Sequence, residues 1–164
     1  MFFVDHSLPT ANFKCYSNIY LAIDAYHRQE FSLPCVWKQT TFGYDGFGVK
    51  VCHTLDDLMT ISKTTNNGTQ ECIIEDHVAI KKEVSVIIAR NPTGQVAQYS
   101  PVEMIFNPTN NQVEYVCYPA NLSADLQSKI TRVVTTLSEK LQHIGLLAIE
   151  LFVTINDQVL VNEL

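Results

Sequence analysis

The sequence has no long hydrophobic run, no closely paired cysteines and no excess of positive charge. No apolar stretch reaches the roughly 18 residues that a membrane-spanning helix needs. Lysine and arginine together number 11 against 17 aspartates and glutamates, and the net charge of −6 argues against a nucleic-acid-binding surface. The five cysteines contain no CxxC pair, so we expect reduced thiols, no zinc site and no disulfide scaffold.

The N-terminal sequence, MFFVDHSLPTANF, also lacks the features of a secretory signal peptide. No basic segment precedes its apolar residues, and Asp5 and His6 interrupt the apolar patch. We therefore expect a cytoplasmic protein without a membrane partner. What the chain does contain is typical of a globular protein, because hydrophobic residues make up 46% and aromatic residues 10% of its 164 residues. This length allows one domain or two small lobes.

The first half of the chain has the pattern of a small α/β lobe. Residues 2–13 are expected to be extended because Pro9 disfavours a helix. Ser17 is a candidate N-cap for a helix at Tyr16–Glu30, and Thr54 is one for a second helix at Leu55–Lys63. Strands are predicted at 34–39, 49–53 and 72–75.

The second half has the pattern of an antiparallel sheet covered by a helix. A stripe of apolar residues predicts a long helix at Ser123–Ile144, and Gly145 is placed to end it. We therefore predict an α+β fold of two lobes, residues 1–76 and 77–164, joined by a connector at Asp76–Lys82. The remaining strands of the second lobe are predicted at 84–90, 95–105 and 112–118.

The last stretch, LLAIELFVTINDQVLVNEL, predicts a buried hairpin with a two-residue turn at Asn156-Asp157. Counting outward from that turn places Thr154 opposite Val159 and Glu150 opposite Glu163. Two carboxylates on adjacent buried strands repel each other, so one of them takes up a proton or a cation lies between them. Hard oxygen ligands suit magnesium that carries a phosphate ligand. The alternative is a longer turn, which shifts the register and points one glutamate to water.

A glycine-rich loop, KQTTFGYDGFG, connects two predicted strands of the first lobe. Its three glycines within six residues let backbone amides approach phosphate oxygens, and Lys38 adds a positive charge. Hairpin loops are often glycine-rich without binding anything. The loop does not match G-x-x-x-x-G-K-[ST], and a strand rather than a helix follows it, so neither a P-loop nor a Rossmann turn fits.

In combination, these segments resemble the ATP-grasp fold. GYDGFG, EDHVAIKKEVSVIIAR, AIELF and LVNEL occur in the order found in the 5-(carboxyamino)imidazole ribonucleotide synthetases, also described as the ATPase subunit of phosphoribosylaminoimidazole carboxylase. GYDGxG is the sharpest marker. The resemblance implies a ligase of purine biosynthesis that uses ATP and Mg2+ to join bicarbonate to 5-aminoimidazole ribonucleotide through carboxyphosphate. It also implies a homodimeric parent enzyme whose partners are these small molecules.

The resemblance implies a role for each matching residue. Lys38 meets the ATP phosphates, Glu75–Val78 is a hinge whose backbone reads adenine, and Glu83 binds the ribose hydroxyls. Glu150 and Glu163 hold magnesium. Tyr44 and Asp45 lie near the imidazole ribonucleotide, and Asp45 and Lys38 are the candidate catalytic residues. Without the resemblance, Glu83 is an exposed charge before a strand and Tyr44 is surface decoration. The implied ATP-binding residues are Lys38, Gly43, Tyr44, Asp45, Gly46, Phe47, Gly48, Val49, Glu75, Asp76, His77, Val78, Glu83, Phe106, Asn162 and Glu163.

The sequence departs from the family pattern in two respects. Phe106 stands where the family usually has a histidine, and Phe cannot donate a hydrogen bond to a phosphate. The family also has an N-terminal domain of about a hundred residues and an APRxHNSGH motif after NE, and neither is present here. We therefore expect the ATP-binding core of a longer enzyme, inactive alone. The alternatives are another ATP-grasp ligase, such as a formate-using glycinamide ribonucleotide transformylase, or a nucleotide-binding module without activity.

Overall fold

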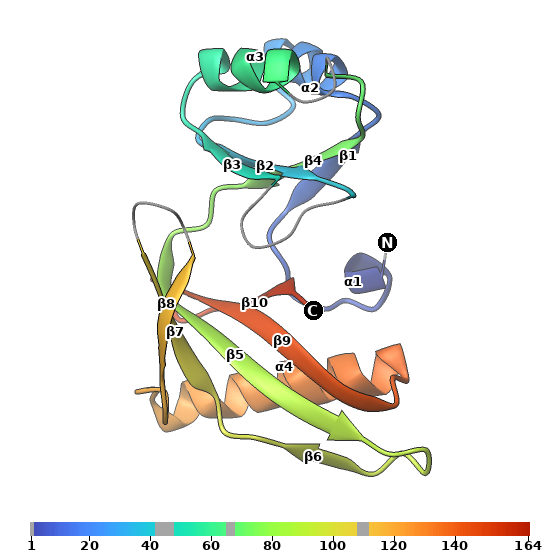
Figure 1. The fold of residues 1–164 in the computed structure, drawn as a ribbon, viewed down its shortest axis with the longest axis vertical. Coiled ribbons are helices and arrows are strands. Elements are labelled where there is room, and N and C mark those ends of the chain that lie inside the picture. The colour runs from blue at the N-terminus through green and yellow to red at the C-terminus, as the bar shows by residue number, and fades with distance from the viewer. Residues whose placement is uncertain (1, 42–47, 65–67, 108–111) are drawn as a thin grey trace. The chain divides into compact units, whose positions relative to one another are not determined.

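The structure is a computed structural model that describes residues 2–41, 48–64, 68–107 and 112–164. The described chain forms two compact units. One unit comprises residues 11–78, and the other comprises residues 1–10 together with residues 79–164 (Figure 1).

The first unit is a four-stranded antiparallel sheet with two helices on one face (Figure 1). The helices are α2 (Ile19–His27) and α3 (Leu55–Thr64). Side chains alternate along the strands, so that Cys35, Trp37 and Ile74 pack against the helices while their neighbours face away from them. In spatial order the strands are β1 (Phe13–Tyr16), β4 (Cys72–Asp76), β2 (Cys35–Gln39) and β3 (Val49–Cys52).

The two helices begin at polar caps. The side chain of Asn18 accepts a hydrogen bond from the Leu21 amide at 2.9 Å, so Asn18, and not Ser17, caps α2. Residues 13–16, part of which was assigned to this helix, form β1 instead, because they pair with β4. Thr54 behaves as predicted at α3, since its Oγ1 accepts from the Asp57 amide while the Asp57 carboxylate accepts from the Thr54 amide.

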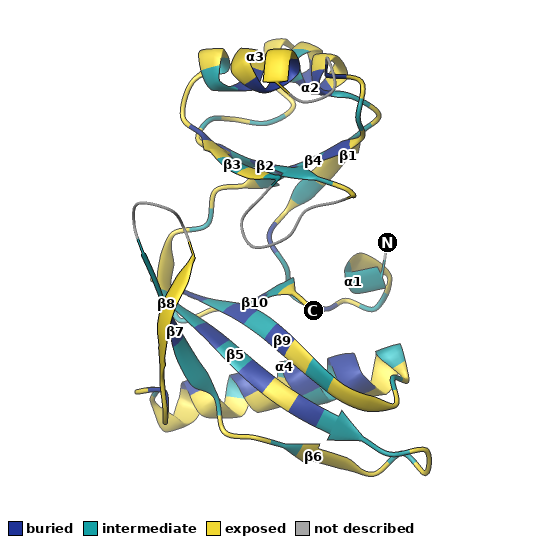
Figure 2. Cartoon of the chain, viewed as in Figure 1, coloured by how far each residue is buried: buried dark blue, intermediate teal, exposed yellow. Residues whose placement is uncertain are grey.

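The second unit is a larger antiparallel sheet with α4 (Ala124–Leu141) along one face (Figure 1). Its central strand β5 pairs with β9 over its whole length and with both β6 and β7. The core between sheet and helix is apolar, and Val84, Ile130 and Ile149 are fully buried. Figure 2 shows buried residues along β5, β9 and α4. The strands are β5 (Ile80–Arg90), β6 (Val96–Gln98), β7 (Val102–Phe106), β8 (Val113–Cys117), β9 (Gly145–Thr154) and β10 (Val159–Glu163).

Three predicted boundaries in this unit are wrong. The helix ends at Leu141, because Gln142 adopts the left-handed conformation (φ 55°), and Gly145 begins β9 instead of ending α4. The strand predicted at 95–105 is interrupted before Val102, where Pro101 has no amide to donate. Residues predicted to be extended at the N-terminus instead include a single helical turn, α1 (Phe2–Asp5).

The first ten residues pack with the second unit, which differs from the predicted lobe of residues 1–76. Thr10 forms an isolated parallel bridge with Val161, and the Val161 amide donates to the Pro9 carbonyl at 2.7 Å. Leu8 is buried in the same core as β5 and α4. The connector is also shorter than predicted, since Asp76 ends β4 and Ile80 begins β5. Within the described residues, no helix combines the length and the apolar character that a membrane crossing requires.

Gly68 provides a test of the packing of the first unit. Its φ is +71°, and a Cβ added there would lie 2.7 Å from Ile19 Cγ2 and 3.1 Å from the Ser62 carbonyl oxygen. We expect Gly68→Ala to lower the free energy of unfolding by about 2–4 kcal/mol, through backbone strain and overpacking together. Urea denaturation of the variant and the parent chain measures the loss.

Gly94→Ala is the matched control. Gly94 has a similar φ of +86°, but its added Cβ would meet only the end of the flexible Arg90 side chain, at 3.4 Å. This variant should lose about 1–2 kcal/mol from backbone strain alone. Equal losses in the two variants would show that the close contacts of Gly68 contribute nothing.

Candidate functional site

The C-terminal hairpin has a longer turn than predicted. Thr154 pairs with Gln158 through a 2.9 Å bond from its amide, and Asp157 adopts a left-handed conformation (φ 56°). The loop is therefore Ile155-Asn156-Asp157, in place of the predicted two-residue turn. As a result Val159 pairs with Val153, and not with Thr154, so the predicted register is wrong by one residue in this part of the hairpin.

A β-bulge then restores the predicted pairing of the two glutamates. The register shifts between Val161 and Glu163, and Glu163 pairs directly with Glu150. Without the bulge, the register near the turn would pair Asn162 with Glu150 and place Glu163 opposite Ile149, on the buried face of the sheet. The bulge therefore keeps Val161 in the core and puts both glutamates on the face of the sheet that does not contact α4.

Three carboxylates share this face. Burial raises the pKa of Glu150, and the charge of Glu163 raises it further. Glu83 on β5 pairs with Phe152 and so lies diagonal to Glu150. Burial, followed by the charge of Glu150, raises the pKa of Glu83 to about 7. This part of the sheet therefore holds more negative charge than its surroundings stabilise, which favours binding of a cation or of hydroxyl donors.

Apolar side chains lie next to these carboxylates. Met104 pairs with Glu83 and is buried, and Phe106 lies two residues further along the same strand, on the same face. Phe106 is half-buried. It adds no donor or acceptor beside Glu83, so the position that resembles the family's histidine is apolar here.

The donor set fits magnesium only in part. Among the described residues, no group of three or more His, Cys, Asp or Glu side chains is arranged to hold a metal ion. Glu150 and Glu163 offer two hard oxygen ligands on paired strands. Mg2+ in nucleotide sites is commonly held by one or two carboxylates together with phosphate oxygens and water. The pair therefore fits a metal that arrives with a phosphate ligand.

A second group of predicted residues lies on the first unit. The Lys38 ammonium contacts the Glu75 carboxylate at 2.8 Å, and both side chains are largely buried, with 21% and 16% of their surfaces exposed. The two residues lie on adjacent strands and on the sheet face away from α2 and α3. The Asn12 side chain donates to the Asp76 carboxylate at 2.9 Å, which secures the end of β4 just before His77 and Val78.

Of the glycine-rich loop, the structure describes residues 38–41 and Gly48. Gly43, Tyr44, Asp45, Gly46 and Phe47 lie outside the described residues. Gly48 has a φ of +82°, and its carbonyl accepts from the Gln39 amide at 2.7 Å. Val49 begins β3 opposite Lys38. The residues flanking the loop are therefore joined by backbone pairing next to the lysine.

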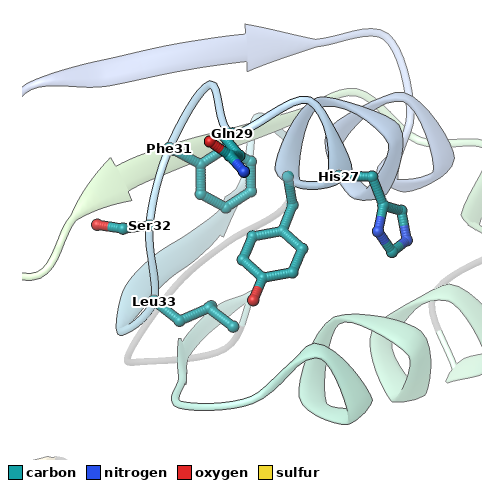
Figure 3. A pocket seen from close by; sticks show the side chains of 6 residues that line it. His27, Gln29, Phe31, Ser32 and Leu33 are labelled. Carbon is teal, nitrogen blue, oxygen red and sulfur yellow. The ribbon is translucent and has the colours of Figure 1, made fainter.

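A pocket of about 710 Å³ lies elsewhere on the first unit, at the C-terminal end of α2 (Figure 3). Tyr26 and Phe31 contribute aromatic surface, and their ring centroids are 5.8 Å apart. None of the predicted site residues lines it. The other lining residues are His27, Gln29, Ser32 and Leu33.

The sequence patterns did not predict two of the contacts above. The Lys38–Glu75 ion pair depends on β2 pairing with β4, two strands that are far apart in the chain. The closeness of Glu83 to Glu150 depends on the register of β5 against β9. Alternation of polar residues on each strand was the available signal, but it does not identify which strands pair.

The first unit carries a lysine in an ion pair with a glutamate, and the second unit carries two paired glutamates. A sequence model of the ATP-grasp domain matches residues 1–164. The chain belongs to the ATP-grasp family.

Particular ATP-grasp enzymes are similar to this chain over most of its length. The N5-carboxyaminoimidazole ribonucleotide synthase of Bacillus subtilis is 34% identical over 136 residues, 83% of this chain and 35% of the relative. That of Synechococcus elongatus is 30% identical over 96% of this chain and 38% of the relative. A crystal structure of an N5-carboxyaminoimidazole ribonucleotide synthetase in complex with ADP matches with a TM-score of 0.86 and 32% identity, over 98% of this chain and 41% of that chain. The chain thus spans well under half the length of these relatives.

The raised pKa of Glu83 predicts that the free energy of unfolding depends on pH. Its folded-state pKa of about 7 lies above its ordinary value of 4.5, so the folded chain binds more protons between these values. The contribution of the carboxyl to stability is therefore present below pH 4.5 and is lost as the pH rises through 7. Glu83→Gln should raise the free energy of unfolding at pH 8 by on the order of 1 kcal/mol, a value reduced for partial solvent screening, and change it little at pH 4.5.

Urea denaturation at the two pH values, with carbon-13 NMR of the Glu83 carboxyl, measures both effects. Glu150→Gln is the companion variant. It should lower the Glu83 pKa by removing a nearby charge, yet leave that pKa above 4.5, because burial is the larger cause. A Glu83 midpoint near 4.5 in the parent chain would contradict this account.

Proposed function

We propose that this chain is the ATP-binding core of a ligase that carboxylates 5-aminoimidazole ribonucleotide with bicarbonate in purine biosynthesis, through carboxyphosphate. The observation that carries the proposal is the pairing of Glu150 with Glu163 in a chain about 30% identical to N5-carboxyaminoimidazole ribonucleotide synthases. The proposal includes a cytoplasmic location and a homodimeric whole enzyme, both taken from the family resemblance.

The large sheet supports roles in binding metal and ribose. Glu150 and Glu163 would hold Mg2+ through carboxylate oxygens, and the metal would supply positive charge to the ATP phosphates. It would also offset the charge of Glu163, which adds to burial in raising the Glu150 pKa. Asn162, the extra residue of the bulge, sets the position of Glu163. Glu83 accepts hydrogen bonds from the ribose hydroxyls, and these bonds favour its ionised form.

The first unit supports roles in binding phosphates and adenine. Lys38 forms an ion pair with Glu75 and pairs with Val49 at the start of β3. A bound phosphate would compete with the Glu75 carboxylate for the Lys38 ammonium. The glycine-rich segment from Gly43 to Val49 covers the phosphates, and the backbone of Glu75–Val78 reads the adenine edge. Tyr44 and Asp45 contact the imidazole ribonucleotide, and Asp45 acts with Lys38 in catalysis.

One observation favours a second candidate, a nucleotide-binding module without activity. Phe106 lies on the carboxylate face of the large sheet, where it offers no hydrogen bond to a phosphate or to a reacting carboxylate. Under this second proposal the chain binds Mg2+–ATP, but the whole protein does not carboxylate. Another ATP-grasp ligase remains a third possibility, which the Tyr44-Asp45 pair argues against.

The metal role predicts that nucleotide binding depends on Mg2+. In calorimetry with ATP, we expect Mg2+ to increase the affinity of the chain, and Glu163→Gln to reduce that increase about tenfold or more, because one of two metal ligands is lost. Glu114→Gln, an identical change at an exposed position of β8, is the control and should leave the increase intact. Equal Mg2+ dependence in both variants would remove Glu163 from the metal site.

Phosphate release separates the proposed activities. The whole enzyme should release phosphate from ATP only when 5-aminoimidazole ribonucleotide and bicarbonate are both present. Since this chain spans 35–41% of its similar relatives, we expect it to bind Mg2+–ATP without such release when it is assayed alone. Release by the whole protein that ignores the ribonucleotide would favour another ATP-grasp ligase, and no release would favour the inactive module.

A further inference from the structure

Two buried cysteines lie directly opposite each other in the first unit. Cys35 begins β2, Cys52 ends β3, and the two residues pair across the antiparallel ladder. Their exposed fractions are 1% and 0%. Directly paired residues on antiparallel strands have Cα atoms about 4.5–5.5 Å apart. A disulfide bond requires about 4.4–6.8 Å, so the two backbones already satisfy this requirement.

The two thiols also contact each other. They share a hydrogen bond, which is the largest influence on the pKa of each. This interaction lowers the pKa of Cys52 and raises that of Cys35. The Cys52 Sγ also donates to the Lys50 carbonyl at 3.7 Å. Burial works in the opposite direction at Cys52, while the charge of Lys50 lowers its pKa further. Cys52 is therefore the more nucleophilic thiol of the pair.

No other described cysteine has such a partner. Cys72 is buried in the same core, but it pairs with Gln39 and Tyr16, and burial raises its pKa to about 11. Cys15 is exposed and pairs with Ile73, and Cys117 is exposed in the other unit. The register of the sheet therefore selects one pair among the five thiols.

The edge of the sheet offers a route for an oxidant. Among the strands that the structure describes, β3 is the outermost of the four-stranded sheet and has β2 as its single neighbour. Opening an edge strand exposes Cys52 without disrupting the pairing of β2 with β4, since edge strands have one neighbour to lose. Oxidation of the pair is then slower than oxidation of the exposed Cys15 and Cys117, but it ends in an intramolecular bond.

We propose that Cys35 and Cys52 form a reversible cross-strand disulfide when the protein meets a hydroperoxide. The Cys52 thiolate attacks a peroxide oxygen, breaks the O–O bond and becomes a sulfenic acid, releasing an alcohol or water. The Cys35 sulfur then attacks the Cys52 sulfur, which forms the S–S bond and expels water. The two thiols are oxidised by two electrons, and the peroxide is reduced by two.

This bond would link the two strands that flank the glycine-rich segment. Residues 40–48 connect β2 to β3, and the Cys35–Cys52 pair closes the other end of this hairpin, three pairs away from Lys38 and Val49. The inference does not depend on the proposed function, because the bond can be detected whether or not the chain binds nucleotide.

The test uses the chain with its exposed thiols removed by Cys15→Ser and Cys117→Ser. The protein is treated with hydrogen peroxide, free thiols are blocked with N-ethylmaleimide, and peptides are mapped by mass spectrometry without reduction. We expect one linked peptide that joins Cys35 to Cys52, is two hydrogens lighter than its parts, and separates on addition of dithiothreitol. The oxidised chain should also melt several degrees higher, because the link restricts the unfolded chain.

Cys72→Val is the matched control, since it changes a buried thiol of the same core. It should leave the linked peptide and the melting shift in place, while Cys52→Val should abolish both. Free Cys35 and Cys52 after full exposure to peroxide, conversion of either to sulfinic acid, or a link to Cys72 would each overturn the proposal. Peptide mapping of the peroxide-treated parent protein tests whether Cys35 and Cys52 become linked, even if a valine variant does not fold.

Discussion

The large sheet depends on a conflict between burying apolar side chains and keeping two carboxylates out of the core. β10 contributes Val159 and Val161 to the core, and strict alternation from Val161 would carry Glu163 onto the same buried face. One extra residue, Asn162, resolves the conflict by moving Glu163 to the other face, opposite Glu150. An unpaired buried carboxylate costs several kcal/mol, whereas a bulge costs little more than one backbone pairing. The candidate metal site is therefore a consequence of a local irregularity in an otherwise regular hairpin.

Much of the fold follows from patterns that are local in the sequence. The long amphipathic helix, the Thr54 cap and the β-branched strand at Val84–Arg90 were all predicted, because periodicity and capping are properties of neighbouring residues. The Glu150–Glu163 pairing was also predicted and is confirmed, although the turn that was assumed is wrong. Two differences from the prediction cancel each other. The turn takes one more residue, Ile155, from the β9 side, and the bulge adds one residue, Asn162, to β10.

The remaining features depend on partners distant in the sequence. β1 and the first ten residues have weak local signals, and each is fixed by a strand more than fifty residues away. The Lys38–Glu75 ion pair and the Glu83–Glu150 interaction likewise require a strand order that alternation does not encode. For Phe106 the sequence was sufficient to show the departure from the family pattern. The structure adds that Phe106 lies two residues from Met104, the partner of Glu83. Roles for these residues come from the resemblance to ATP-grasp enzymes, and the described geometry supplies their surroundings.

The bridge between Thr10 and Val161 makes the first unit an insertion within the second. Residues 11–78 are contiguous, so they have all their own strands and helices as soon as they leave the ribosome. The second unit must instead wait for β10, some 150 residues further along the chain, before residues 1–10 find their place. Its contacts are therefore among the most distant in the chain, which slows folding. Until β10 has left the ribosome, Leu8 lacks the strand to which its neighbours Pro9 and Thr10 are joined.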